Sequence, residues 1–128
     1  MTTSDFLDRL MHDASAHLTG KKDAAFGRYI EDHIPCLDPD SLLNRKEAAI
    51  AVYGMIREVM DTDDIEWGDA ALLKDIYECK VCANAIAQVC ARGIVIPKSK
   101  TIFGMDDILS DREAEQVIMR LSDLVGKR

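Results

Sequence analysis

Residues 40–48 read Asp-Ser-Leu-Leu-Asn-Arg-Lys-Glu-Ala, and residues 106–114 read Asp-Asp-Ile-Leu-Ser-Asp-Arg-Glu-Ala. Asp, Leu, Glu and Ala recur at matched places in the two stretches. A residue that favours helix N-caps, Asn44 or Ser110, follows the same leucine in each. Self-similarity of this kind is the signature of repeated units that bury their apolar faces together. The repeat therefore predicts two copies of one helical unit.

The composition is that of one ordinary globular domain. The chain has 128 residues, of which 48% are hydrophobic and 30% are charged. Only 5% are aromatic, so we expect a core built from aliphatic side chains and methionine. We expect a single compact domain over residues 1–128, with repeat units at about 20–60 and 75–125.

Apolar spacing and capping signals predict an all-α fold, a compact bundle of about five helices. In each repeat the cap residue is followed three places later by Glu, which is the pattern of a capping box. A very short β-hairpin is an additional expectation near residues 94–103, where two apolar runs flank a turn. The expected helices lie at about 5–17, 23–33, 45–60, 70–92 and 111–125.

Charge and hydropathy restrict the partners and the location. The net charge of −7 argues against a nucleic-acid partner and against an anionic membrane surface. No apolar stretch is long enough to cross a bilayer, so we expect no membrane insertion. The first 20 residues carry charges throughout, unlike a signal peptide. We therefore expect a cytoplasmic protein, or a cell-surface location if the chain is a fragment of an exported protein.

The second copy resembles the S-layer homology domain in the order and spacing of several short motifs. These motifs are Asp75-Ile76, residues 81–86 (VCANAI), 93–95 (GIV) and 103–110 (FGMDDILS), followed by Glu113-Ala114. Residues 37–49 match the end of a further copy, with Arg45 in the arginine position of the family. Asp111 stands at that position in the second copy.

The resemblance implies a bacterial, non-catalytic module. Units of this family pack with sister units, often in a threefold arrangement, and anchor proteins to anionic cell-wall polysaccharide. We therefore expect a binding or assembly module, whose partner is another protein, a second copy of itself or an anionic cell-wall glycan. Because only two units are evident, we expect an exposed apolar face that recruits another chain.

Basic side chains near the caps are the candidate anion contacts, because charged donors bind anionic oxygens most strongly. These are Arg45 and Lys46 in the first copy and Arg112 in the second. Trp67, the only tryptophan, completes the set of four candidate ligand-facing residues. Considered by itself, it is interpreted first as an anchor for the acidic loop around it. A platform on which a ligand stacks is the alternative role for Trp67.

The four cysteines leave a second class of function open. Cys79 and Cys82 are separated by two residues, Cys90 falls on the same helix face as Cys79, and Cys36 is the fourth. We favour buried free thiols at a close helix contact, because the second pair that a zinc ribbon needs is missing. One alternative is a small metal-binding or redox-sensing regulator that uses these four cysteines. Another is a disulfide or redox pair among them, which a reducing cytosol disfavours.

No residue set in the sequence indicates catalysis. In the acidic stretch at 61–69, Glu66 stands where a calcium loop needs Gly, so we expect a solvated loop. The three histidines, at positions 12, 17 and 33, are scattered and have no matching nucleophile. We therefore expect no enzyme activity and no cofactor.

Overall fold

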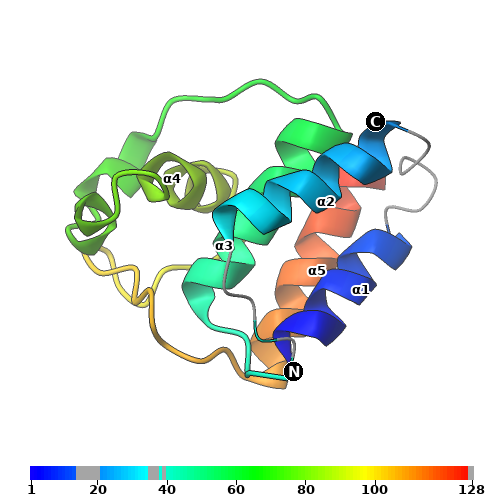
Figure 1. Ribbon diagram of the computed structural model, residues 1–128. Coiled ribbons are helices and arrows are strands. Elements are labelled where there is room, and N and C mark those ends of the chain that lie inside the picture. The colour runs from blue at the N-terminus through cyan, green and yellow to red at the C-terminus, as the bar shows by residue number, and fades with distance from the viewer. Residues whose placement is uncertain (14–20, 35–37, 39, 127–128) are drawn as a thin grey trace.

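The computed structural model describes residues 1–13, 21–34, 38 and 40–126. Within these residues the chain forms five α-helices and no sheet, which confirms the predicted all-α fold (Figure 1). The helices are α1 (Thr3–Asp13), α2 (Lys21–His33), α3 (Arg45–Gly54), α4 (Ala83–Ala91) and α5 (Asp111–Gly126). Three shorter segments are the π-helix η1 (Met55–Val59) and the 3-10 helices η2 (Gly68–Leu72) and η3 (Asp75–Glu78).

The core is organised around α3, which contacts α1, α2 and α4. Residues 48–52 of this helix are all buried, so this stretch has no solvent-facing side. A helix that is apolar on every side belongs in the centre of a fold. In Figure 1, α2 crosses in front of α3, α4 lies to one side, and α1 and α5 lie side by side on the other.

The single long helix predicted at 70–92 is wrong, because this stretch breaks into η2, η3 and α4. Contacts with a distant loop cause the break. The Lys74 N–H donates to the Thr101 carbonyl oxygen at 2.8 Å. The Asp75 carboxylate accepts from the backbone N–H groups of residues 103–104 at 2.8 and 2.9 Å. These bonds fix the chain direction where a continuous helix would have to pass.

Two smaller expectations also differ from the structure. The last turn of the helix predicted at 45–60 widens into η1, and the Met60 N–H donates to the carbonyl oxygen of Met55, five residues back. The hairpin near 94–103 does not form as β-structure. Two backbone hydrogen bonds of 3.1 and 2.9 Å close a turn within residues 98–103, which holds no strand.

The two repeats form equivalent corners at which a loop enters a helix. Asn44 Oδ1 accepts from the Glu47 N–H at 2.7 Å, and Glu47 Oε1 accepts from the Asn44 N–H at 3.3 Å. Ser110 and Glu113 make the same two bonds, at 3.1 and 3.0 Å. Both predicted capping boxes are therefore confirmed, and each satisfies backbone donors at the start of its helix.

Backbone hydrogen bonds join one corner to the other. The Arg45 N–H donates to the Asp107 carbonyl oxygen at 2.9 Å, and the Leu109 N–H donates to the Leu43 carbonyl oxygen at 2.9 Å. The residue just after the first cap thus pairs with the residue three places before the second cap, and the residues just before each cap pair with each other. The two units are held in a fixed relation by their main chains.

The start of the chain forms a third corner, which was not predicted. The Thr2 hydroxyl accepts from the Asp5 N–H at 3.1 Å and so caps α1. Two backbone hydrogen bonds of 3.0 and 3.1 Å join residues 1–3 to residues 41–43, in the same pattern that joins the other two corners. Helices α1, α3 and α5 therefore start from three similar corners, linked in succession.

Candidate functional site

Arg45 is buried at the junction between two corners, with 7% of the residue exposed. Its Nη1 lies 3.1 Å from each of three acceptors, the carbonyl oxygens of Phe103 and Gly104 and Oδ2 of Asp107. Its Nη2 lies 3.6 Å from Oε2 of Glu113. The hydrogen bond from Arg45 holds the pKa of Asp107 below its usual value. This predicted ligand contact therefore binds groups within the chain.

Lys46 and Arg112 occupy the same place in their units, two residues after the cap. The Lys46 residue is half-buried, and Arg112 is exposed on the first turn of α5. Neither side chain forms an ion pair with any residue of the described part of the chain. These two cations are available to a ligand, whereas Arg45 is not.

Trp67 anchors the acidic loop to α4, as the sequence indicated. Its Nε1 donates to Oδ1 of Asn84 at 3.0 Å, and its ring lies 6.1 Å from that of Tyr77. Asn84 Nδ2 donates in turn to the Tyr53 hydroxyl at 3.1 Å and to Asp64 at 3.0 Å. Burial, followed by the hydrogen bond to Asp64, raises the pKa of Tyr53. In the described part of the chain, the hydrogen bond and the ring contact of Trp67 are made to Asn84 and Tyr77, not to the three basic candidates.

The rest of the acidic loop at 61–66 is also tied to α4. The side chain of buried Gln88 accepts from the Ile65 N–H at 2.9 Å and donates to the Ile65 carbonyl oxygen at 2.7 Å. Arg92 donates to the carbonyl oxygen of Asp63 at 2.7 Å. The loop's acidic side chains are exposed, so the loop combines a solvated surface with a fixed backbone.

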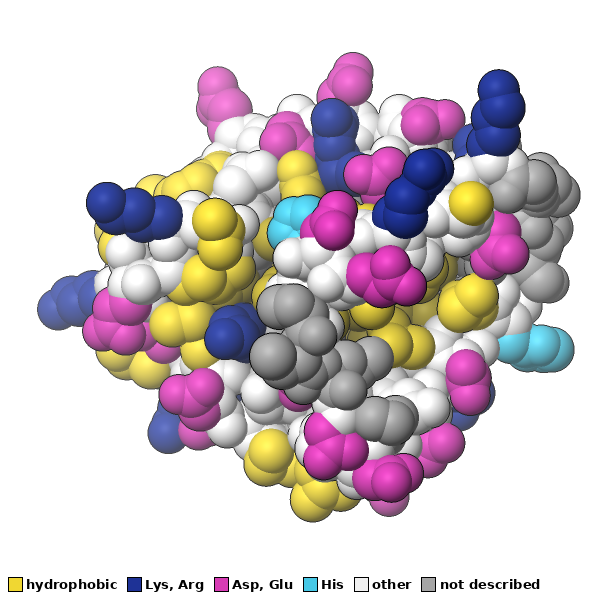
Figure 2. Space-filling view, viewed as in Figure 1, with side chains coloured by type: hydrophobic (Ala, Val, Ile, Leu, Met, Phe, Trp, Pro, Cys, Tyr) yellow, Lys and Arg dark blue, Asp and Glu magenta, His cyan; other side chains and the backbone are white. Residues whose placement is uncertain are grey.

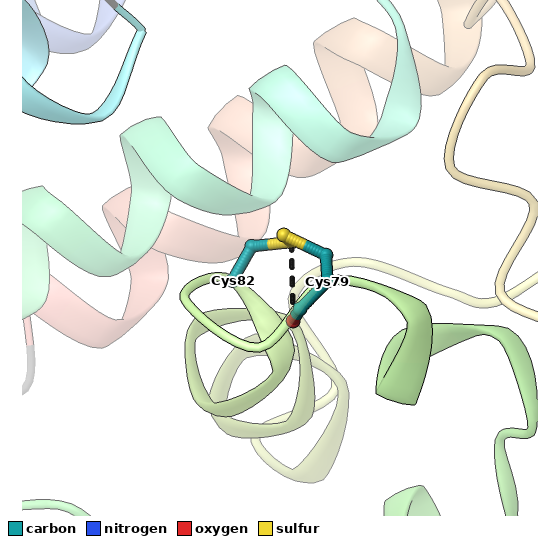
Figure 3. The surroundings of a disulfide bond; sticks show 2 residues. All are labelled: Cys79 and Cys82. Atoms are coloured by element: carbon teal, nitrogen blue, oxygen red, sulfur yellow. Dashed lines mark hydrogen bonds between the residues drawn. A yellow bond between two sulfur atoms is a disulfide. The ribbon is translucent and has the colours of Figure 1, made fainter.

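Cys79 and Cys82 are joined by a disulfide at the start of α4, on the side that faces α3 (Figure 3). The expectation of free thiols is therefore wrong for this pair. The backbone is extended at Cys79, and α4 begins only at Ala83, so the two cysteines lie outside regular helix. Their Cα atoms are 5.4 Å apart, a separation that suits a disulfide.

The remaining cysteines do not join this pair in the described part of the chain. Cys90 is a free thiol, and burial raises its pKa to about 12. Cys36 lies outside the described residues. Among the residues that are described, no three His, Cys, Asp or Glu side chains are grouped so that they would hold a metal ion. A metal site at Cys79, Cys82 and Cys90 is therefore not formed.

The disulfide lies in the wall of a hollow of about 400 Å³ between α2, α3 and the start of α4. Lys46 and His33 supply basic groups to this hollow, and Tyr29 and Val81 supply apolar surface. The His33 ring stacks on Tyr29 with ring centroids 4.2 Å apart, and its Nδ1 lies 2.9 Å from the Tyr29 carbonyl oxygen. Because a carbonyl oxygen only accepts, Nδ1 carries a proton in this contact.

A second hollow of about 400 Å³ lies beside η2. Leu72, Leu73 and Pro97 line it, together with Cys90. Figure 2 shows hydrophobic side chains gathered on the side of the molecule that holds α4, with a basic side chain among them and a histidine nearby. The part of the chain around α4 therefore presents both hollows and much exposed apolar surface.

In the described residues, no helix combines the length and the apolar character that crossing a membrane requires. A scan of the sequence against protein-family models finds no match. Searches of curated proteins and of solved structures likewise find no match. The function is therefore inferred from the arrangement of the residues themselves.

Proposed function

We propose that this chain is a non-enzymatic protein-interaction module assembled from S-layer-homology-like units. The observation that carries the proposal is the recurrence of one corner, a capped helix start joined to the next by the same pair of backbone hydrogen bonds. Repeated units of this kind form extended surfaces along which partners bind. The likeness of residues 75–124 to the family supports the same function.

The exposed apolar side chains indicate where a partner binds. Apart from Leu42 and Met119, the large hydrophobic residues that are exposed in the described chain all lie between residues 65 and 108. Leu72 is 59% exposed beside the hollow at η2, and Val81 is 85% exposed beside the disulfide. Apolar surface concentrated in this way is typical of protein contacts. The start of α1 supplies a third corner, so a missing third unit is not needed to explain why this apolar surface would bind another chain.

Charge favours a protein partner over an anionic glycan. The Arg45 guanidinium, at the arginine position of the family, is already bound within the chain. The hollow of about 450 Å³ between α1 and α5 is lined by Asp5, Asp8 and Glu115, and its Arg9 already pairs with Glu115 at 2.6 Å. An acidic hollow on a chain of net charge −7 repels a polyanion.

The proposal is tested first on association of the chain with a second copy, measured by sedimentation velocity over a range of concentrations. We expect association that strengthens with added salt, because salt screens the repulsion between two acidic copies. The substitution Leu72→Glu should weaken it. Met119→Glu is the matched control, since Met119 is equally exposed, at 60%, but belongs to α5, outside the segment 65–108 that carries most of the exposed apolar residues.

Two results would contradict the proposal. One is a strict monomer at every concentration combined with co-sedimentation with purified anionic cell-wall polysaccharide, which would favour the glycan anchor. The other is an equal effect of Leu72→Glu and Met119→Glu, which would separate association from the apolar surface.

A further inference from the structure

We propose that Cys79 and Cys82 form an exchangeable disulfide, which thiols entering the hollow between α2, α3 and α4 reduce reversibly. This adds a redox activity to the interaction role and does not depend on it. The substrate class is a dithiol, or a pair of thiols, small or exposed enough to reach the wall of this hollow. Four features of the site carry the inference.

The first feature is the short loop that the bond closes. Cys79 and Cys82 are separated by only two residues in the chain. A disulfide stabilises a fold mainly by restricting the unfolded chain, and it does so least when the loop is short. The two helices that pack beside the bond, α3 and α4, are already fixed by the burial of their own side chains in the core. The bond therefore adds little as a structural staple.

The second feature is the unequal exposure of the two sulfur-bearing residues. Cys82 is 3% exposed, whereas Cys79 is half-buried, and both line the hollow. An incoming thiol needs access to one sulfur only, along the line of the S–S bond. The hollow supplies this access at Cys79, while Cys82 is shielded by the packing of α4.

The third feature is the placement of Cys82 immediately before α4, a helix of nine residues. A thiolate at the start of a helix is favoured by the unpaired N–H groups and the positive end of the helix dipole. The helix dipole therefore favours Cys82 as the leaving thiolate, and in the disulfide its side chain makes no capping hydrogen bond. The Cys82 sulfur also contacts the Cys79 carbonyl oxygen, at 3.6 Å (Figure 3), an acceptor for its proton once it is reduced.

The fourth feature is the charge of the hollow. The Lys46 ammonium lines it without an ion pair to any described carboxylate, and the imidazole of His33 lies in the same wall. Asp32 is the one acidic residue among the lining groups of the described chain. A cation in the same hollow as the bond attracts the thiolate form of an incoming substrate, which is the form that reacts.

The exchange balances as two successive substitutions. A substrate thiolate attacks Sγ of Cys79, a new S–S bond forms between them, and the electron pair of the broken bond leaves on Sγ of Cys82. A second substrate thiolate then attacks the substrate sulfur of this mixed disulfide and releases Cys79 as a thiolate. The two protons lost by the substrate thiols are taken up by Cys79 and Cys82. In sum, two thiols are oxidised to one disulfide while the protein disulfide is reduced to two thiols.

The experiment uses the folded full chain and dithiothreitol as the probe. The protein is equilibrated in buffers of stated ratios of reduced to oxidised dithiothreitol, quenched in acid, alkylated and mapped by mass spectrometry. We expect Cys79 and Cys82 to gain alkyl groups together, as one two-electron couple, without loss of helical circular dichroism. Oxidised dithiothreitol should restore the bond. Resistance to reduction until urea unfolds the chain would overturn the proposal.

Variants then locate the attack. With 5,5′-dithiobis(2-nitrobenzoic acid), the thiol of Cys79 in Cys82→Ser should react at least about tenfold faster than that of Cys82 in Cys79→Ser. Since this reagent is an anion, Lys46→Gln should slow the reaction at Cys79 by about threefold, as expected for removing one nearby charge in water. Lys21→Gln, an exposed lysine at the far end of α2, is the matched control and should change nothing.

Each of these measurements also has an outcome that overturns the proposal. Faster reaction at Cys82 than at Cys79 would contradict the assigned direction of attack. Equal rates for Lys46→Gln and Lys21→Gln would remove the role of the hollow. If either serine variant fails to fold, the mixed disulfide is mapped on the wild-type chain quenched early in the reaction, and it must lie on Cys79. Self-association is read separately through Leu72→Glu, so failure of one proposal leaves the other intact.

Discussion

Replacing Arg45 by methionine separates a structural from a ligand-binding role for this residue. The substitution keeps a long apolar side chain but removes the donor that Phe103, Gly104 and Asp107 share at 3.1 Å. A hydrogen bond to a charged group contributes about 1.5–3 kcal/mol, and breaking a buried charged pair costs about 3–5 kcal/mol. The three bonds use a single nitrogen and Asp107 is 41% exposed, so their contributions do not add. We therefore expect a loss of about 3 kcal/mol in the free energy of unfolding.

The loss is measured by urea unfolding followed by far-ultraviolet circular dichroism. With a slope of about 2 kcal/mol per molar urea, the midpoint should fall by about 1.5 M. Arg112→Met is the matched control, because its exposed side chain has no ion pair among the described residues, and it should shift stability by less than about 0.5 kcal/mol. Arg45→Lys should recover only part of the loss, since an ammonium does not reproduce the geometry of the guanidinium. Equal urea midpoints for Arg45→Met and Arg112→Met would refute the claim that Arg45 stabilises the fold at the junction between the two corners.

Three further predictions concern acid, packing and helix propensity. The backbone N–H of Ser110 holds the pKa of Glu113 below its usual 4.5, so its stabilising contribution is present above that pH and is lost as the pH falls through the lowered value. Urea midpoints should therefore decline on acidification below about pH 4.5, less steeply in Glu113→Gln. Gly54→Ala would place a Cβ 2.3 Å from the ring of buried Tyr29, and should cost about 2 kcal/mol. A Cβ added at Gly27 would meet open space, so Gly27→Ala should instead raise the free energy of unfolding by up to about 1 kcal/mol, measured by thermal unfolding.

The helix starts were predictable because their signals are local. Asn44 and Glu47, like Ser110 and Glu113, bond to each other within one turn, so the residue types alone imply the contact. The corner at Thr2 has the same logic, with Asp5 in the place of Glu. The pattern Thr-x-x-Asp before an apolar residue would have identified this third unit.

The break in the helix predicted at 70–92 was not predictable from local pattern. Apolar spacing continues through this stretch, but Lys74 and Asp75 are held by backbone groups of residues 101–104, nearly thirty residues further on. Helix propensity is a weak preference that such tertiary contacts override. The disulfide is the less favoured alternative in the sequence, because a continuous helix over 70–92 makes Cys79 and Cys82 small apolar residues of one helix. The break before Ala83 releases both cysteines from that helix and lets them pair.

The candidate site depends on the directions in which the first two side chains of α3 point. Arg45 and Lys46 are neighbours in sequence and both are basic, so the sequence pattern predicts the same anion-binding role for both. Successive helix residues point about 100° apart, and this rotation sends Arg45 into the junction with Asp107 while Lys46 faces the hollow that holds the disulfide. The first turn of α3 thus contributes to both parts of the molecule. Its buried cation fixes two units together, and its half-exposed cation remains available for chemistry at Cys79.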